Sequence, residues 1–144
     1  MKLKLLFIMI FLSTVQSSFA VNTDAGLMDE HMQYWMKVLE THPLILIRKQ
    51  AARHLGNMQN SLAIPSLIKG LADTSEEVKM QSAYSLGRLG DPAALRPLYE
   101  LIESGGTAQV QSAARNAIDK INLHEEFKHQ QKQKLKEFEL RESN

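Results

Sequence analysis

The sequence contains no cysteine and few aromatic residues, and its positive and negative charges nearly balance. Without cysteine the chain can form no disulfide framework and offers no thiol for lipid attachment. A formal net charge of +1 over 144 residues gives no reason to expect a nucleic-acid partner, which selects a strongly basic surface. Aromatic residues make up only 6%, whereas Ala, Leu, Gln, Glu and Lys are plentiful. This composition favours an all-helical domain.

The first twenty residues are typical of a secretory signal peptide. Lys2 and Lys4 precede an apolar run over 5–12, and Ser18-Phe19-Ala20 forms a small-x-small cleavage site. We therefore expect cleavage after Ala20 and a periplasmic or secreted protein with no stable membrane span. The alternative is an uncleaved anchor, but the run is short of the roughly 20 residues that cross a bilayer. The mature chain, from residue 21, has 15 basic and 16 acidic side chains, a net charge of −1.

Three segments recur along the chain at spacings of 31 and 32 residues: 47–58, 78–89 and 110–121. Each opens with a β-branched residue and has a small residue four places on and an aliphatic residue eight places on. An apolar residue closes each segment at the eleventh place. These places share one face of a helix. They hold Ile47, Ala51, Leu55 and Met58; Val78, Ser82, Leu86 and Leu89; and Val110, Ala114, Ile118 and Ile121.

A second recurring helix is predicted between these segments, over 63–71 and 94–102. Pro65 and Pro97 fall in its first turn, where a missing N–H has no consequence. Its apolar stripe is Ile64, Leu67, Ile68 and Leu71 in one copy and Leu95, Leu98, Tyr99 and Ile102 in the other. Residues 29–40 supply the missing first helix, with Trp35 as a core or cap residue and His42-Pro43 as the turn.

The motifs "IRKQAARHLGNM…LAIPSLIKGLAD" and "VKMQSAYSLGRLGDPAALRPLYELI" resemble HEAT repeats of the short phycobilisome-lyase-like type. The resemblance covers roughly 44–122 and implies an all-α, right-handed α-α solenoid of about three helical hairpins. We expect a repeat domain over 21–122, with repeats near 29–58, 61–89 and 92–121, and a charged helical tail over 123–144. Because such a solenoid supports many activities, the resemblance leaves the function open.

Gly90-Asp91-Pro92 is predicted to be a hinge between two helices rather than a site of chemistry. Gly90 fits the left-handed position that ends a helix, Asp91 the cap and Pro92 the first position of the next helix. Asn60 and Ser61 occupy the equivalent places one repeat earlier. Gly87 is expected to let a neighbouring helix approach closely. A phosphate-binding loop would need Gly-Lys-Ser/Thr after a strand, which is absent.

No catalytic residue, metal site or cofactor is predicted. A di-iron hydroxylase family with similar repeats carries His-Glu pairs at the second and third places of each segment. Here those places read Lys49-Gln50, Met80-Gln81 and Ser112-Ala113. The five histidines form no metal-binding spacing, and no catalytic triad is suggested. The resemblance keeps one alternative open, an accessory subunit or small enzyme of the lyase-like class that handles a bilin chromophore.

The three recurring segments are rich in basic residues, and Asp119 is their only acid. In the family that the chain resembles these helices line the concave face, so the resemblance implies a basic inner surface. The residues one place after each opening residue would form one ladder across this surface: Arg48, Lys79 and Gln111. The residues ten places after it would form a second ladder: Asn57, Arg88 and Lys120. We expect a non-catalytic interaction scaffold that binds an acidic peptide or protein there. The alternative is an ordinary solvated face. The candidate partner-binding residues are Arg48, Lys49, Arg53, Lys79, Met80, Tyr84, Arg88, Arg115 and Lys120.

From residue 123 the sequence is highly charged and rich in glutamine. No glycine or proline separates it from the third recurring segment, so a helical extension is predicted. One interpretation is a solvated helix that frays near its end. The other is docking on a partner or a second copy through Phe127, Leu135 and Phe138. Both stay open from sequence.

Overall fold

The computed structural model describes residues 30–142. The chain divides into two compact units, Met1–Tyr34 and Trp35–Asn144, and the repeats belong to the second. The predicted signal peptide and its cleavage site lie outside the described residues. Every regular element described is helical. The elements are a helix over 30–41, α2 (Ile45–Asn57), the 3₁₀ turn η1 (Ser61–Ala63), α3 (Ile64–Gly70), α4 (Glu76–Leu89), the 3₁₀ turn η2 (Pro92–Ala94), α5 (Leu95–Glu103) and α6 (Ala108–Glu142).

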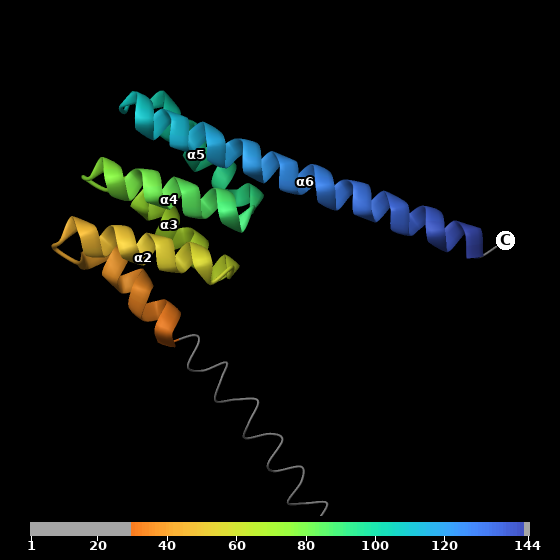
Figure 1. Ribbon diagram of the computed structural model, residues 1–144, viewed down its shortest axis with the longest axis horizontal. Coiled ribbons are helices and arrows are strands. Elements are labelled where there is room, and N and C mark those ends of the chain that lie inside the picture. Colours follow the sequence, from red (N-terminus) through yellow and green to blue (C-terminus); the bar gives the residue numbers. More distant parts are fainter. Residues whose placement is uncertain (1–29, 143–144) are drawn as a thin grey trace, which may run out of the picture. The chain divides into compact units, whose positions relative to one another are not determined.

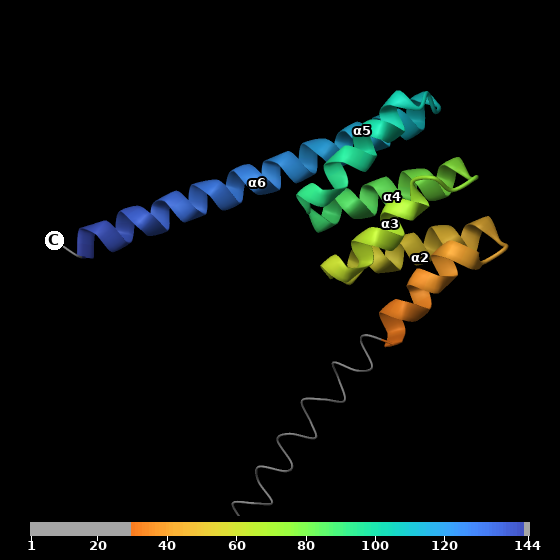
Figure 2. The same ribbon diagram turned by 180° about the vertical axis from the view of Figure 1, so that it is seen from behind.

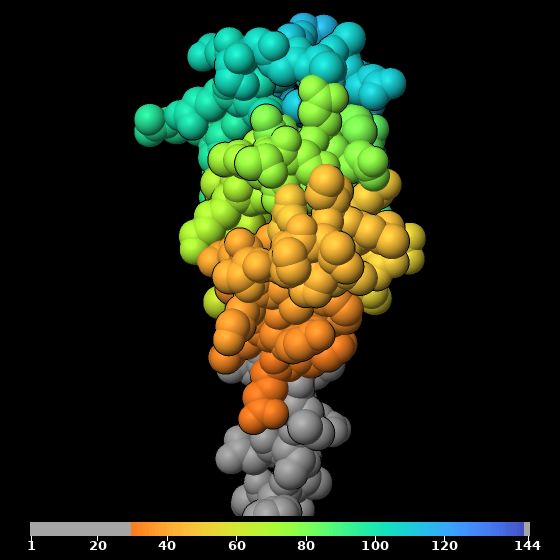
Figure 3. Space-filling model, turned by 90° about the vertical axis from the view of Figure 1, so that its left-hand side faces the viewer, coloured from red at the N-terminus to blue at the C-terminus, as the bar shows by residue number. Residues whose placement is uncertain are grey.

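The helices of the second unit form two layers. Helices α2, α4 and α6 lie side by side, with α3 and α5 behind them (Figures 1 and 2). The central helix α4 packs against α2, α3 and α6, and α5 packs against α6. In the end-on view the hairpins from α2 onward stack in chain order (Figure 3). The predicted all-α solenoid of helical hairpins is confirmed for the described residues.

The turns between hairpins follow the sequence prediction closely. Gly90 ends α4 in the left-handed conformation, with φ 67° and ψ 23°. The Asp91 side chain then accepts a hydrogen bond from the Ala93 N–H at 2.9 Å, and Pro92 opens η2. Asn60 caps η1 in the same way, through the Leu62 N–H at 3.0 Å. Gly-Asp-Pro is therefore a hinge, and its aspartate is used as a cap.

Close contact between neighbouring helices depends on small residues. A Cβ added at Gly87 would lie 2.7 Å from the Ala117 Cα, so only glycine lets α4 and α6 approach this closely. Gly56 meets Ser85 in the same manner, and the Ser85 hydroxyl donates to the Ala52 carbonyl at 2.8 Å. The Gly and Ala places of the repeat thus set the spacing of the stack.

The predicted core is largely confirmed, with one correction in α5. Leu55, Leu86 and Leu98 are fully buried. Tyr99, placed in the apolar stripe by the sequence, is 51% exposed, and Leu101 is buried in its stead. The matching residue of α3, Ile68, faces α5 in the next hairpin. No further hairpin follows α5 within the described residues, so Tyr99 has nothing to cover it.

Helix α6 joins the third recurring segment to the charged tail without a break. Ile121 is its last buried residue. The repeat domain therefore ends where side-chain burial stops, while the helix continues without a break. At the other end of the unit, the half-buried Trp35 stacks on His54 of α2, with ring centroids 4.4 Å apart. Trp35 therefore covers α2, as the cap interpretation predicted.

Candidate functional site

The solvent-facing residues of α2, α4 and α6 form a regular grid. They occupy the second, sixth and tenth places after the residue that opens each recurring segment. At about 100° per residue these places fall within about 80° of one another, so they share one side of each helix. All are exposed or half-buried. We call this grid the B-face; it consists of Lys49, Arg53 and Asn57 of α2, Met80, Tyr84 and Arg88 of α4, and Ser112, Asn116 and Lys120 of α6.

The B-face carries four basic residues and no acidic one. Lys49 is partly neutralised, because its Nζ lies 2.8 Å from the Glu77 carboxylate at the start of α4. Arg88 reaches across to α2 and donates to the Asn57 side chain, so these two residues form part of the predicted ladder. Within residues 30–142, Arg53 and Lys120 make no hydrogen bond or ion pair. The positive charge of the B-face is therefore available to a partner, apart from that of Lys49, which Glu77 partly neutralises.

A shallow hollow of about 490 Å³ lies on the B-face side between α4 and α6. Met80 and Tyr84 line it from α4, and Ala108, Gln109 and Ser112 line it from α6. Tyr84 is 40% exposed. Aromatic and methionine side chains in this situation are typical anchor points of protein interfaces. The structure thus brings Met80 and Tyr84 together beside the basic residues of the grid.

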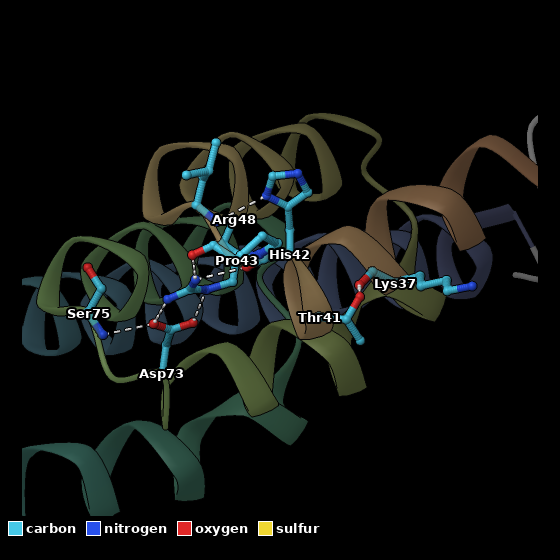
Figure 4. A network of polar contacts seen from close by, with 8 residues as sticks. Lys37, Thr41, His42, Pro43, Arg48, Asp73 and Ser75 are labelled. Carbon is cyan, nitrogen blue, oxygen red and sulfur yellow. Dashed lines mark hydrogen bonds and ion pairs between the residues drawn. The ribbon is translucent and has the colours of Figure 1, made fainter.

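Arg48 does not belong to the B-face, which corrects the predicted ladder at place one. Its guanidinium makes two hydrogen bonds to the Asp73 carboxylate, at 2.7 and 2.8 Å, and a third to the His42 carbonyl at 2.9 Å (Figure 4). The two charged side chains are only 11% and 10% exposed. The hydrogen bonds from Arg48 lower the pKa of Asp73 below its ordinary value, and burial opposes them in part. Arg48 ties α2 to the α3–α4 turn.

The other residues at place one also lie away from the B-face. Lys79 is half-buried and lines a hollow between α3 and α5 with Ile68 and Leu101. Gln111 donates to the Gly106 carbonyl at 3.1 Å. The residue directly after the opening one is rotated about the helix axis by about 100° to 180° from the B-face residues. It therefore points toward the interhelical turns and toward helices such as α3 and α5. Arg48, Lys79 and Gln111 therefore form no ladder across the B-face.

Arg115 marks the end of the stack rather than its charged face. The equivalent residues of α2 and α4, Ala52 and Ala83, are fully buried, and Ala52 lies against α4. Arg115 is exposed, because no helix packs beyond α6 within the described residues. A charged residue at this place gives the last hairpin a polar outer surface, as solenoid ends require.

One exposed apolar cluster was missed by the sequence analysis. Leu44, Ile45 and Leu46, at the start of α2, are exposed by 61, 47 and 60%. The equivalent residues are Ser75-Glu76-Glu77 before and within α4 and Thr107-Ala108-Gln109 before and within α6. Comparing the three repeats just ahead of the recurring segments would have revealed this difference.

The described residues hold no group of three or more His, Cys, Asp or Glu side chains that could bind a metal ion. A hollow of about 470 Å³ beside the Arg48–Asp73 pair also contains Glu40 and Lys69. Lys69 Nζ lies 2.9 Å from the Glu40 carboxylate, and this hydrogen bond lowers the pKa of Glu40. The charged groups of this hollow therefore satisfy one another, and the B-face is the stronger candidate for binding.

The fold and the B-face together define a helical-repeat protein in which α2, α4 and α6 expose one side to solvent. A sequence profile of HEAT repeats matches residues 32–119, more than half of the chain, so the protein belongs to the HEAT-repeat family. Repeats of this family generally serve as scaffolds for protein interactions. Within residues 30–142 no helix combines the length and apolar character that crossing a bilayer requires.

Two curated proteins show a shorter similarity. They are the bilin biosynthesis proteins PecE of Nostoc sp. (strain PCC 7120) and of Mastigocladus laminosus, each 40% identical over 60 residues. The match covers 40% of this chain and 23% and 22% of the two relatives. Because less than a quarter of either relative is spanned, the similarity supports the repeat type and leaves their activity to be tested separately.

Proposed function

We propose that this protein is an exported interaction scaffold that holds an acidic segment of a partner protein on the B-face. The observation that carries the proposal is the sign of the charge: the nine exposed or half-buried side chains of the B-face include four basic and no acidic ones. A second contact is offered by the hollow at Met80 and Tyr84, which fits an apolar side chain of the same partner. Carboxylates beside Arg53, Arg88 and Lys120 would supply orientation and fast association.

Photo-crosslinking tests where the partner binds. A photoreactive phenylalanine analogue replaces Tyr84 in one variant and Tyr99 in a control, because both tyrosines are exposed but only Tyr84 lies on the B-face. We expect one partner to be captured through residue 84 and not through residue 99, and mass spectrometry to place an acidic stretch at the attachment point. Equal capture at both positions would contradict the proposal.

Charge reversal tests the chemistry once the partner is purified. We expect Arg53→Glu with Lys120→Glu to weaken binding at least about 10-fold, since each replacement turns an attraction into a repulsion. Arg96→Glu with Arg141→Glu makes the same change in net charge away from the B-face and should leave affinity within about 2-fold. An equal loss in both variants would show that only the overall charge matters.

Export is part of the proposal and rests on the N-terminal sequence of basic residues, apolar run and cleavage site. Fractionation of cells with N-terminal sequencing of the recovered chain tests it. We expect a chain that begins at Val21 in the exported fraction. Recovery of a chain beginning at Met1 in the cytoplasm would refute export without affecting the B-face experiments.

The second candidate is an accessory role in bilin biosynthesis, which rests on the 60-residue similarity to the PecE proteins. It predicts that the chain itself binds a linear tetrapyrrole. Absorbance titration of the purified protein with biliverdin distinguishes the two candidates. A saturable spectral shift would favour chromophore handling, whereas an unchanged spectrum together with capture at residue 84 favours the scaffold.

A further inference from the structure

The part of α6 beyond the repeats, residues 123–142, exposes several large apolar side chains. Ile121 is the last buried residue of the helix. Beyond it Leu123, Phe127, Leu135, Phe138 and Leu140 are all exposed, by 58 to 67%. The His124 ring lies against Gly90, and a helix that extends beyond such a contact gains little stability from its own hydrogen bonds. An additional helix packed along this segment would supply the missing contacts.

Four of these five residues lie on one side of the helix. At about 100° per residue, Leu123, Phe127, Leu135 and Phe138 fall within a sector of about 120°, with Gln131 inside it. Leu140 points to the opposite side. The segment therefore has a single apolar stripe, and one helix is the partner that such a stripe accommodates.

We infer that the stripe pairs antiparallel with the same stripe of a second copy of this chain. The apolar residues are placed almost symmetrically about Gln131: Phe127 and Leu135 lie four residues to either side, and Leu123 and Phe138 eight and seven. Reversing the helix about Gln131 therefore places apolar residues opposite apolar residues. A two-fold symmetric pair requires this self-complementarity, whereas an unrelated partner does not.

The charges of the segment favour the same orientation. Residues 123–131 contain two acidic side chains and one basic one, whereas 132–142 contain four basic and three acidic ones. An antiparallel pair places the net negative half against the net positive half, and a parallel pair places like against like. Antiparallel pairing also opposes the two helix dipoles and separates the repeat domains to opposite ends of a rod of about 30 Å.

Sedimentation equilibrium of the full chain tests the association. We expect an average mass that rises with concentration from the mass of one chain toward twice that value. Phe127→Glu with Leu135→Glu places charge in the stripe and should raise the dimer dissociation constant at least about 10-fold. Leu140→Glu, on the opposite side, is the matched control and should leave it within about 2-fold. A wild-type chain that stays monomeric at millimolar concentration overturns the inference.

Cysteine crosslinking tests the orientation, and the chain offers a clean background because it has no cysteine of its own. Gln131→Cys lies at the expected two-fold axis and should form a disulfide with its own copy. Phe127→Cys alone should not, since its two copies would be about 12 Å apart, beyond the roughly 7 Å that a disulfide spans. Phe127→Cys mixed with Leu135→Cys should crosslink.

Lys136→Cys, on the opposite side of the helix, is the control and should crosslink in none of these mixtures. A disulfide that forms as readily between two copies of Phe127→Cys as between two copies of Gln131→Cys would show parallel pairing and overturn the orientation. Because the B-face residues are unchanged in every variant, these outcomes are independent of partner binding through Tyr84.

Discussion

At the scale of single residues, the Arg48–Asp73 pair shows how position decides the role of a charge. Both side chains are about one-tenth exposed, and the Asp73 carboxylate also accepts a hydrogen bond from the Ser75 N–H at 2.8 Å. Arg48 thereby fixes the turn that leads into α4 (Figure 4). By contrast, Arg53, five residues further along α2, stays exposed and unpaired among residues 30–142. The first charge stabilises the fold and the second is available for binding.

Replacing Asp73 by asparagine should lower the free energy of unfolding at neutral pH by about 2 kcal/mol, because Arg48 loses its anionic acceptor. The pKa of Asp73 is held below its ordinary value near 3.8. The pair therefore stabilises the wild type fully above that value and less as the pH falls through the lowered pKa. We expect the difference between wild type and variant to narrow below about pH 4.

Urea unfolding at a series of pH values measures this difference. Glu103→Gln, at an exposed residue of α5, is the control and should change the free energy of unfolding by less than about 0.5 kcal/mol at any pH. Parallel curves for wild type and Asp73→Asn down to pH 2 would show that the ion pair contributes nothing to acid sensitivity.

At the scale of elements, the start of α2 lacks a side-chain cap. Leu44 occupies the cap position, with φ −84° and ψ 123°, but its side chain makes no cap hydrogen bond and the first turn has no acidic residue. Asn60 and Asp91 show what a polar side chain does at such a place. Leu44 thus exposes apolar surface at a position where a polar side chain would stabilise the helix.

Leu44→Asp should raise the free energy of unfolding by about 1 kcal/mol, since aspartate caps the helix and favours its positive end. For a domain of this size the thermal midpoint should rise by roughly 4 °C. Leu46→Gln removes similar apolar surface two residues further on, with no charge for the helix dipole and a similar helix propensity, and should leave the midpoint nearly unchanged. Thermal unfolding followed by circular dichroism compares them; equal midpoints would refute the capping argument.

At the scale of the whole second unit, stability depends on α4, which contacts helices on both sides. Gly87 faces α6, whereas Trp35 reports on α2 at the other end through its stacking on His54. If the stack unfolds as one cooperative unit, a change at Gly87 must be felt at Trp35. Trp35 is the only tryptophan of the chain, so its fluorescence is specific to that end.

Gly87→Ala should lower the free energy of unfolding by about 2 kcal/mol, because the added Cβ would lie 2.7 Å from the Ala117 Cα. We expect the tryptophan fluorescence and the far-ultraviolet circular dichroism midpoints to fall together in urea. Gly106→Ala, where an added Cβ would meet nothing closer than 3.5 Å, is the control. A fluorescence midpoint that stays in place while the other falls would show that the hairpins unfold separately.

Most of the fold could be predicted from sequence because side-chain size and backbone conformational preference recur at the same positions of each repeat. The 31-residue spacing, the Gly90-Asp91-Pro92 hinge and the buried Leu55 and Leu86 all appear as predicted. Tyr99 was misplaced because the pattern does not say where stacking stops. Of the nine candidate binding residues, six lie together on the B-face, and Arg48, Lys79 and Arg115 do not.

The sequence by itself determined the helices, their turns and the distance between neighbours, since these depend on contacts that recur in each repeat. Only the tertiary structure decided which charges are available. Arg48 lies within hydrogen-bonding distance of Asp73, 25 residues away, and Arg115 is exposed where Ala83 is buried. Both outcomes depend on the rotation of each helix against its neighbours and on the end of the stack. A repeat pattern is the same in every hairpin, so it cannot carry that information.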